Sequence, residues 1–116
     1  MKNLFFLSLL LLSTHIGAAN CEENAGNFAE VVGCLNNEVS VLKEQLNKTY
    51  INLYMQTKAK TKLEVAQKSW NDYKEKQCDN FSLAEVGPTS TQMAISASCE
   101  IELIQNRITF LKSITQ

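Results

Sequence analysis

The sequence predicts an all-α protein, a small antiparallel bundle of three to four helices stapled by two disulfides. Apolar residues recur at spacings of three and four over long stretches, which is typical of helices that bury one face. No stretch shows the period-two alternation of a half-buried strand. The four cysteines of this 116-residue chain offer covalent links that a small core needs. Gly87-Pro88 is the one strong helix-breaking pair, so we expect short loops.

Residues 1–19 have the pattern of a cleaved secretory signal peptide. Lys2 supplies a positive start, Leu4 to Leu12 is almost entirely apolar, and small residues precede the expected cleavage near Ala19. The apolar run is about nine residues, whereas a membrane-spanning helix needs roughly 20. We therefore expect a periplasmic or secreted protein without a membrane anchor, consisting of a single helical domain over residues 20–116.

The composition of the mature chain argues against several classes of function. Removal of 19 residues from 116 leaves 97, and the loss of Lys2 leaves ten basic and twelve acidic residues, a formal charge of −2. This balance gives no electrostatic basis for binding nucleic acid. The single histidine, His15, lies in the predicted signal peptide, so the mature chain lacks histidine for acid–base or nucleophilic chemistry. We expect no catalytic residue, no metal site and no cofactor, and hence no enzyme.

Cys21, Cys34, Cys78 and Cys99 all belong to the mature chain, and an even number of cysteines in an exported small domain favours disulfides. A four-cysteine zinc site is the alternative, but the separations of 13, 44 and 21 residues include no close pair of the kind that zinc sites use. Three pairings are open. We prefer Cys21–Cys34 with Cys78–Cys99, because both join neighbours in sequence, and each would contribute about 3 kcal/mol.

A first long helix is predicted over residues 28–57, with Asn27 and Glu30 as a capped start. Unbroken, it would be about 45 Å long, whereas a globule of this size is only about 30 to 35 Å across. Either the helix bends near Gly33 or Asn36-Asn37, or one end overhangs and its apolar face binds a second subunit, which predicts a homodimer. The apolar stripe consists of Phe28, Val32, Leu35, Val39, Leu42, Leu46, Tyr50 and Leu53.

A second helix is predicted to begin at a capping box formed by Thr61 and Glu64 and to end near Cys78. Trp70 and Tyr73, one turn apart on its apolar side, are interpreted as core anchors, because aromatic side chains bury the largest areas. The apolar side consists of Leu63, Ala66, Trp70, Tyr73 and Gln77.

A third helix is predicted from about Ser90 to Ser113, and its apolar residues, Leu111 among them, cover more than one face. Arg107, the sole arginine, is interpreted as a buried hydrogen-bond donor to a carboxylate or a helix end. The paired carboxylates Glu100 and Glu102 are expected to be solvated. The longest irregular stretch is residues 79–90.

Taken together, the patterns LNxxYxxL around Leu46, AQxxWxxYxxxxC from Ala66 to Cys78, and C(x)7R from Cys99 to Arg107 resemble the LprI-type lysozyme-inhibitor domain family. The resemblance covers essentially the whole mature chain. Ile104 departs from it, since family members often have Thr three residues before the arginine. The positions that the resemblance places in the structural core are Leu46, Tyr50, Leu53, Trp70, Tyr73, Arg107 and Leu111.

The resemblance implies a periplasmic protein inhibitor of a lysozyme-like muramidase, a peptidoglycan hydrolase. Its role would be either an immunity protein against a secreted effector or a defence against host lysozyme. The segment 79–90 is the expected plug for the enzyme's cleft. Asp79 or Glu85 would contact the cleft, and Phe81 or Leu83 would act as an apolar anchor. The alternative is a non-catalytic envelope interaction or structural module that self-associates.

Overall fold

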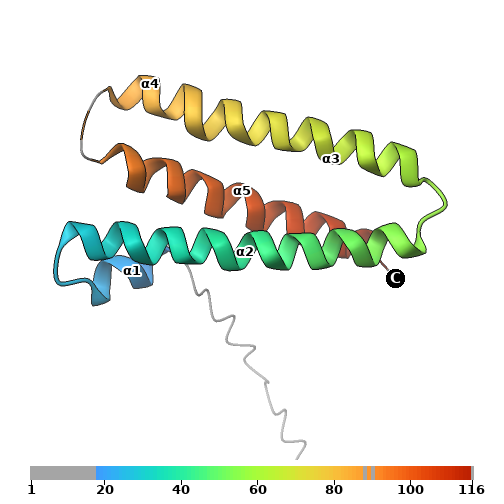
Figure 1. Cartoon of the computed structure of the whole chain (residues 1–116), viewed down its shortest axis with the longest axis horizontal. Coiled ribbons are helices and arrows are strands. Elements are labelled where there is room, and N and C mark those ends of the chain that lie inside the picture. Colours follow the sequence, from blue (N-terminus) through green and yellow to red (C-terminus); the bar gives the residue numbers. More distant parts are fainter. Residues whose placement is uncertain (1–17, 88, 90, 116) are drawn as a thin grey trace, which may run out of the picture.

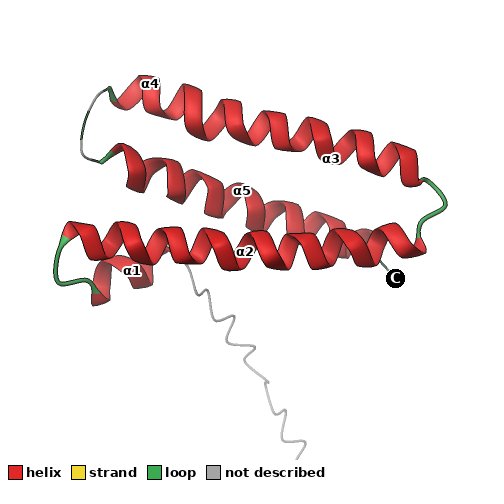
Figure 2. Ribbon diagram, in the orientation of Figure 1, coloured by secondary structure: helices red, strands yellow, loops and turns green. Residues whose placement is uncertain are grey.

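The computed structural model describes residues 18–87, 89 and 91–115, and this part of the chain contains helices and no strand (Figures 1 and 2). The predicted all-α class is therefore correct. Successive long helices run antiparallel, so the first and the last run parallel to each other (Figure 1). The predicted signal peptide falls largely on residues 1–17, outside the described residues. The helical elements are α1 (Ala18–Asn24), α2 (Phe28–Gln56), α3 (Lys60–Glu75), the π-helix η1 (Lys76–Phe81), α4 (Ser82–Val86) and α5 (Gln92–Ile114).

Helix α2 is a single 29-residue helix, about 44 Å long at 1.5 Å per residue. Its start matches the sequence prediction, because the side chain of Asn27 accepts a hydrogen bond from the Glu30 N–H at 3.0 Å. The Glu30 carboxylate reaches back and accepts from the Gly26 N–H at 2.6 Å, one residue before the usual capping-box partner. The helix continues through Gly33 without a break, so the molecule is elongated instead of bent.

The core lies between α2 and α5, which pack side by side along most of their lengths (Figure 1). Leu46, Leu53 and Leu111 are buried there as predicted, and the half-buried Tyr50 and Trp70 pack against its edge. The helical stripes of α2 and α5 meet because their apolar residues recur every three to four positions. The buried cluster consists of Cys21, Leu35, Val39, Leu42, Leu46, Leu53, Ala97, Ile101, Ile104, Ile108 and Leu111.

Both preferred disulfides are present. Cys21–Cys34 ties α1 to α2 with a Cα–Cα distance of 5.6 Å, and Cys78–Cys99 ties η1 to α5 with 5.5 Å, both ordinary for disulfides. The second link is important because α3 makes few close backbone contacts with α2 or α5, whereas η1, which follows it directly, packs on α5. The two disulfides therefore fasten α1 and the α3–η1 segment to the α2–α5 core.

The start of α3 differs from the prediction. The helix begins at Lys60 after Ala59, and no side chain caps it, so the expected capping box of Thr61 and Glu64 does not form. Instead Thr57 organises the connector, since its Oγ1 accepts from the Ala59 N–H at 3.0 Å. Thr57, in the connector, therefore takes the hydrogen-bonding role that was predicted for Thr61 inside the helix.

The end of the second helix was also predicted wrongly, because the chain remains helical past Cys78 to Val86. The connection is a π-helical turn in which the Ser82 N–H bonds to the Gln77 carbonyl, and the Ser82 hydroxyl donates to the same oxygen at 2.7 Å. A wider turn shifts which residues face inward. Cys78 is thereby buried against α5, whereas Phe81 points outward and is 56% exposed.

Tyr73 is the one predicted core residue that the structure contradicts, since it is 53% exposed. The position facing the interior is its neighbour Lys74, which is only 8% exposed. Lysine is almost never buried without a partner. Lys74 takes the inner position in place of Tyr73 because it forms an ion pair with Glu100 of α5.

Candidate functional site

A groove of about 500 Å³ runs between α2 and α3 above α5. It exists because α3 makes few close backbone contacts with either α2 or α5 after the connector that joins it to α2. Aromatic side chains stand on both walls, Tyr50 on α2 and Trp70 on α3, among amides and lysines. The lining residues are Lys43, Leu46, Asn47, Tyr50, Glu64, Gln67, Lys68, Trp70, Asn71, Lys74 and Ile104.

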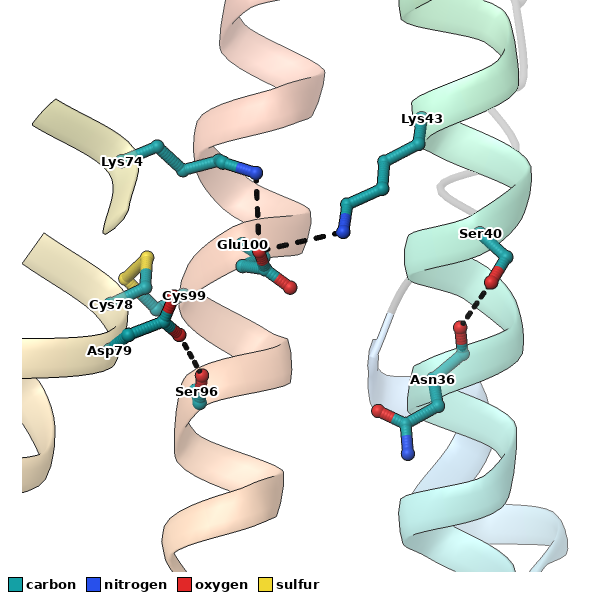
Figure 3. Close-up of polar contacts among 9 residues, drawn as sticks. All are labelled: Asn36, Ser40, Lys43, Lys74, Cys78, Asp79, Ser96, Cys99 and Glu100. Atoms are coloured by element: carbon teal, nitrogen blue, oxygen red, sulfur yellow. Dashed lines mark hydrogen bonds and ion pairs between the residues drawn. A yellow bond between two sulfur atoms is a disulfide. The ribbon is translucent and has the colours of Figure 1, made fainter. Parts of the chain in front are cut away.

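One end of the groove is closed by an ion triad. The Lys74 Nζ lies 3.2 Å from Glu100 Oε1, and the Lys43 Nζ lies 3.8 Å from the same oxygen (Figure 3). Side chains of Lys74 and Glu100 are only 10% and 16% exposed, so this pair is shielded from water. Glu100 was expected to be solvated, and it is instead the carboxylate that neutralises a buried lysine. No sequence signal indicated it, since its partners lie 26 and 57 residues away.

Arg107 lies against the ring of Trp70. Its Nε donates to Gln67 Oε1 at 3.0 Å, and its guanidinium lies 5.8 Å from the centre of the Trp70 ring and 5.5 Å from that of Phe110. Partial burial lowers the pKa of Arg107 from its ordinary value. The sequence predicted a buried, hydrogen-bonded arginine, and Arg107 is hydrogen-bonded but only half-buried. Its partner is a neutral amide and two aromatic rings, not the expected carboxylate or helix end.

The opposite end of the groove leads to a second aromatic cluster. The rings of Tyr50 and Tyr54 stack with centroids 6.0 Å apart, and the Lys60 ammonium lies 5.3 Å from the Tyr54 ring. The Glu64 carboxylate raises the pKa of Tyr54, first by hydrogen bonding and then by its negative charge. This cluster joins the last turn of α2 to the first turn of α3.

The connector between α2 and α3 forms one extreme end of the molecule, at the right of Figure 1. We call residues 57–62 the cationic tip, because Lys58, Lys60 and Lys62 fall within five positions and are all exposed. Among the described residues, no ion pair involves any of these lysines. The pattern was visible in the sequence as KAKTK, but on its own it reads as a solvated link.

The four predicted enzyme-contacting residues lie on a helix, not on a loop. Asp79 accepts a hydrogen bond from the Ser96 hydroxyl at 2.8 Å, which ties η1 to α5 (Figure 3). Leu83 is half-buried beside α5, whereas Phe81 and Glu85 are exposed. The structure thus leaves only Phe81 and Glu85 fully available to a partner. The irregular segment is limited to the few residues between Val86 and Gln92.

A further apolar hollow of about 540 Å³ lies at the start of α2 and is lined chiefly by Phe28, Val31, Leu35, Ala94 and Ile95. In the described part of the chain, no group of three or more His, Cys, Asp or Glu side chains is arranged to hold a metal ion. No described helix is both long and apolar enough to span a membrane.

The fold defines a small helical protein stapled by two disulfides. A comparison with known families gives its particular membership: residues 18–111 match the family described as lysozyme inhibitor LprI, and the chain belongs to that family. The resemblance noted in the sequence is thus confirmed over most of the chain. No curated protein and no solved structure shows a significant match.

Proposed function

We propose that this protein is an exported inhibitor of a lysozyme-like muramidase. The observation that carries the proposal is the match to the lysozyme inhibitor LprI family over residues 18–111. The proposal includes export to the periplasm, with residues 1–19 removed as a signal peptide. The role would be immunity against a secreted effector or defence against a host lysozyme, depending on which muramidase is bound.

The architecture suits obstruction of an enzyme. Two disulfides hold α1 and η1 against the α2–α5 pair. A preorganised protein loses little conformational entropy on binding, so more of its contact energy is retained as affinity. The buried lysine, Lys74, is held in place by its ion pair with Glu100. Such a body blocks a cleft by occupying it.

The test is a lytic assay in which purified, oxidised protein is added to muramidases acting on cell-wall suspensions. The panel contains an animal-type lysozyme and any muramidase encoded beside the gene. The expected result is a saturable slowing of lysis at near-stoichiometric inhibitor, lost when the protein is reduced and alkylated. Inhibition of the neighbouring enzyme alone would indicate immunity, and inhibition of the animal-type enzyme would indicate host defence. Undiminished lysis by every enzyme tested would contradict the proposal.

Two ends of the long α3–α4 segment offer exposed contact surfaces. The α4 end carries Phe81 and Glu85, and we retain these as one proposed contact with the enzyme, with Phe81 as its apolar anchor. The other end is the cationic tip. They lie about 40 Å apart along 27 helical residues, from Lys60 to Val86, so a single narrow cleft would accommodate only one of them.

A second candidate function is a self-associating envelope interaction module. It is favoured by large apolar side chains that remain in solvent on α2, where Ile51 is 50% exposed and Met55 is 73% exposed. On α5, Phe110 and Ile114 are also half exposed. Burial of such residues against a second copy would stabilise a homodimer, and the Discussion gives the test.

A further inference from the structure

The cationic tip differs from the other lysine-bearing surfaces in the concentration of its charge, because three lysines lie within five positions. The other described lysines without an ion pair, Lys68, Lys76 and Lys112, are spread over α3, η1 and α5. Lys74 and Lys43 share Glu100, and Lys48 lies 3.4 Å from Glu44. Within the described residues, Lys58 and Lys62 make no ion pair and no side-chain hydrogen bond. Their ammonium groups are therefore unengaged donors at the end of the rod.

The backbone of the tip is held in one conformation. The Thr57 N–H bonds to the Leu53 carbonyl at 2.9 Å, which closes the last turn of α2. The Thr57 Oγ1 then accepts from the Ala59 N–H at 3.0 Å, and the Lys60 ammonium donates to the Thr57 carbonyl at 3.0 Å. Lys60 is therefore used within the tip. A turn fixed in this way loses little entropy when it enters a partner.

The tip and the groove are two candidate surfaces for contact with an enzyme, and their shapes favour the tip. A glycoside hydrolase binds its polymer in a concave cleft, and a concave groove such as that between α2 and α3 would leave empty space against it. The tip protrudes as a whole, because a three-residue connector joins two antiparallel helices at the end of the molecule, although its surface has a hollow of about 360 Å³ lined by residues 58–62. It therefore fits a cleft, whereas the groove does not.

The positive charge of the cationic tip indicates which groups of the enzyme it would contact. Glycoside hydrolases generally carry two catalytic carboxyl groups about 5 to 10 Å apart, flanking the scissile bond. Ammonium–carboxylate hydrogen bonds are strong when water is excluded, as it would be beneath an inserted tip. We propose that the cationic tip enters the catalytic cleft of the muramidase, with the ammonium groups of Lys58 and Lys62 pairing with its catalytic carboxylates. This inference rests on the proposed inhibitory function. It adds which surface of the protein inhibits the enzyme and which charged groups make the contact.

The experiment compares inhibition constants of two charge-matched double variants against the enzyme that the wild-type protein inhibits. The test variant is Lys58→Gln with Lys62→Gln, and the control is Lys68→Gln with Lys76→Gln, exposed lysines on α3 and η1. All four side chains are exposed, so circular dichroism and the melting temperature should remain unchanged. We expect the inhibition constant to rise at least tenfold for the tip variant and less than threefold for the control.

A double-mutant cycle identifies the partner atoms. Binding of wild-type protein and tip variant is measured to the active muramidase and to one with a catalytic carboxylate changed to its amide. The expected result is that the amide weakens binding of the wild type at least fivefold and leaves that of the tip variant nearly unchanged. Equal weakening of both proteins would contradict pairing with that carboxylate in particular.

Other outcomes separate this inference from the proposed function. Full inhibition by the tip variant, or an equal loss for the control variant, would overturn the role of the tip while leaving the protein an inhibitor. A loss seen only with Phe81→Ser and Glu85→Gln would overturn it in favour of the α4 end. If the wild-type protein inhibits no muramidase, the proposed function itself fails.

Discussion

At the scale of single residues, the Lys74–Glu100 pair is the contact whose loss is expected to cost most. Both side chains are largely shielded from water, and their charged atoms lie 3.2 Å apart. Glu100→Ala would leave a buried ammonium with no nearby carboxylate and should lower the free energy of unfolding by about 3 kcal/mol. Lys43, 3.8 Å from the same oxygen but half exposed, contributes less.

The matched variant is Lys74→Met with Glu100→Met, which removes both charges of the buried pair and nearly keeps the volume. Since a buried ion pair replaced by apolar groups is often neutral or stabilising, this variant should change stability by less than about 1 kcal/mol. Urea unfolding followed by Trp70 fluorescence measures both. A Glu100→Ala protein as stable as the wild type would show that water reaches the Lys74 ammonium.

Glu38 gives a pH-dependent prediction. One of its carboxylate oxygens is buried without a hydrogen-bond partner, and this desolvation raises the pKa of Glu38 above its ordinary value of 4.5. The folded state then holds the proton more tightly than the unfolded state, so ionised Glu38 destabilises the fold above its raised pKa and has no effect below pH 4.5. Glu38→Gln should stabilise the protein at pH 7 and not at pH 4, as measured by thermal melts at both pH values.

The residue scale also shows where sequence reasoning fails. Trp70 and Tyr73 lie one turn apart, and hydrophobicity alone places both in the core. In the structure Lys74 takes the inner position instead, because Glu100 neutralises it. A pairing between residues 26 positions apart leaves no periodic signal, so the sequence could not reveal either this core position or the triad at the end of the groove.

At the scale of elements, helices with long apolar stripes were predicted well. The first was expected over residues 28–57 and spans Phe28–Gln56, and the last was expected from 90 to 113 and spans Gln92–Ile114. The segment 79–90 was misjudged because one π-helical turn carries the chain past Cys78 without a break. Such a turn changes the helical period locally. A search for apolar residues at the 3.6-residue period of an α-helix therefore does not detect the helix there.

The two disulfides should act on different elements. Each closes a short loop, of 13 or 21 residues, so replacing either pair with serine should lower the free energy of unfolding by about 3 kcal/mol. The local effects should differ. Loss of Cys78–Cys99 should speed amide hydrogen exchange throughout α3 and α4, because this disulfide is the covalent link between the α3–α4 segment and α5.

The matched variant, Cys21→Ser with Cys34→Ser, should speed exchange in α1 and leave α3 protected. Hydrogen-exchange mass spectrometry of both variants, under conditions where each remains folded, distinguishes the two patterns. Uniform exchange across all helices in both would mean that the molecule opens only as a unit, and that α3 has stronger attachments than its packing indicates.

At the scale of the whole molecule, α2 is unbroken, so the alternative of a homodimer applies. Exposed apolar side chains on α2 would form its interface. Burial of Ile51 and Met55 against a second copy would remove apolar area from water, at about 25 cal/mol per Å² before the costs of association. We predict that light scattering of the mature protein will give a mass that rises toward the dimer with concentration. Ile51→Lys with Met55→Lys should restore the monomer, whereas the control Lys68→Gln should not. A monomer mass at every concentration would contradict self-association. The proposed insertion of the cationic tip would be unaffected by that result, because one tip enters one cleft and a single chain is sufficient.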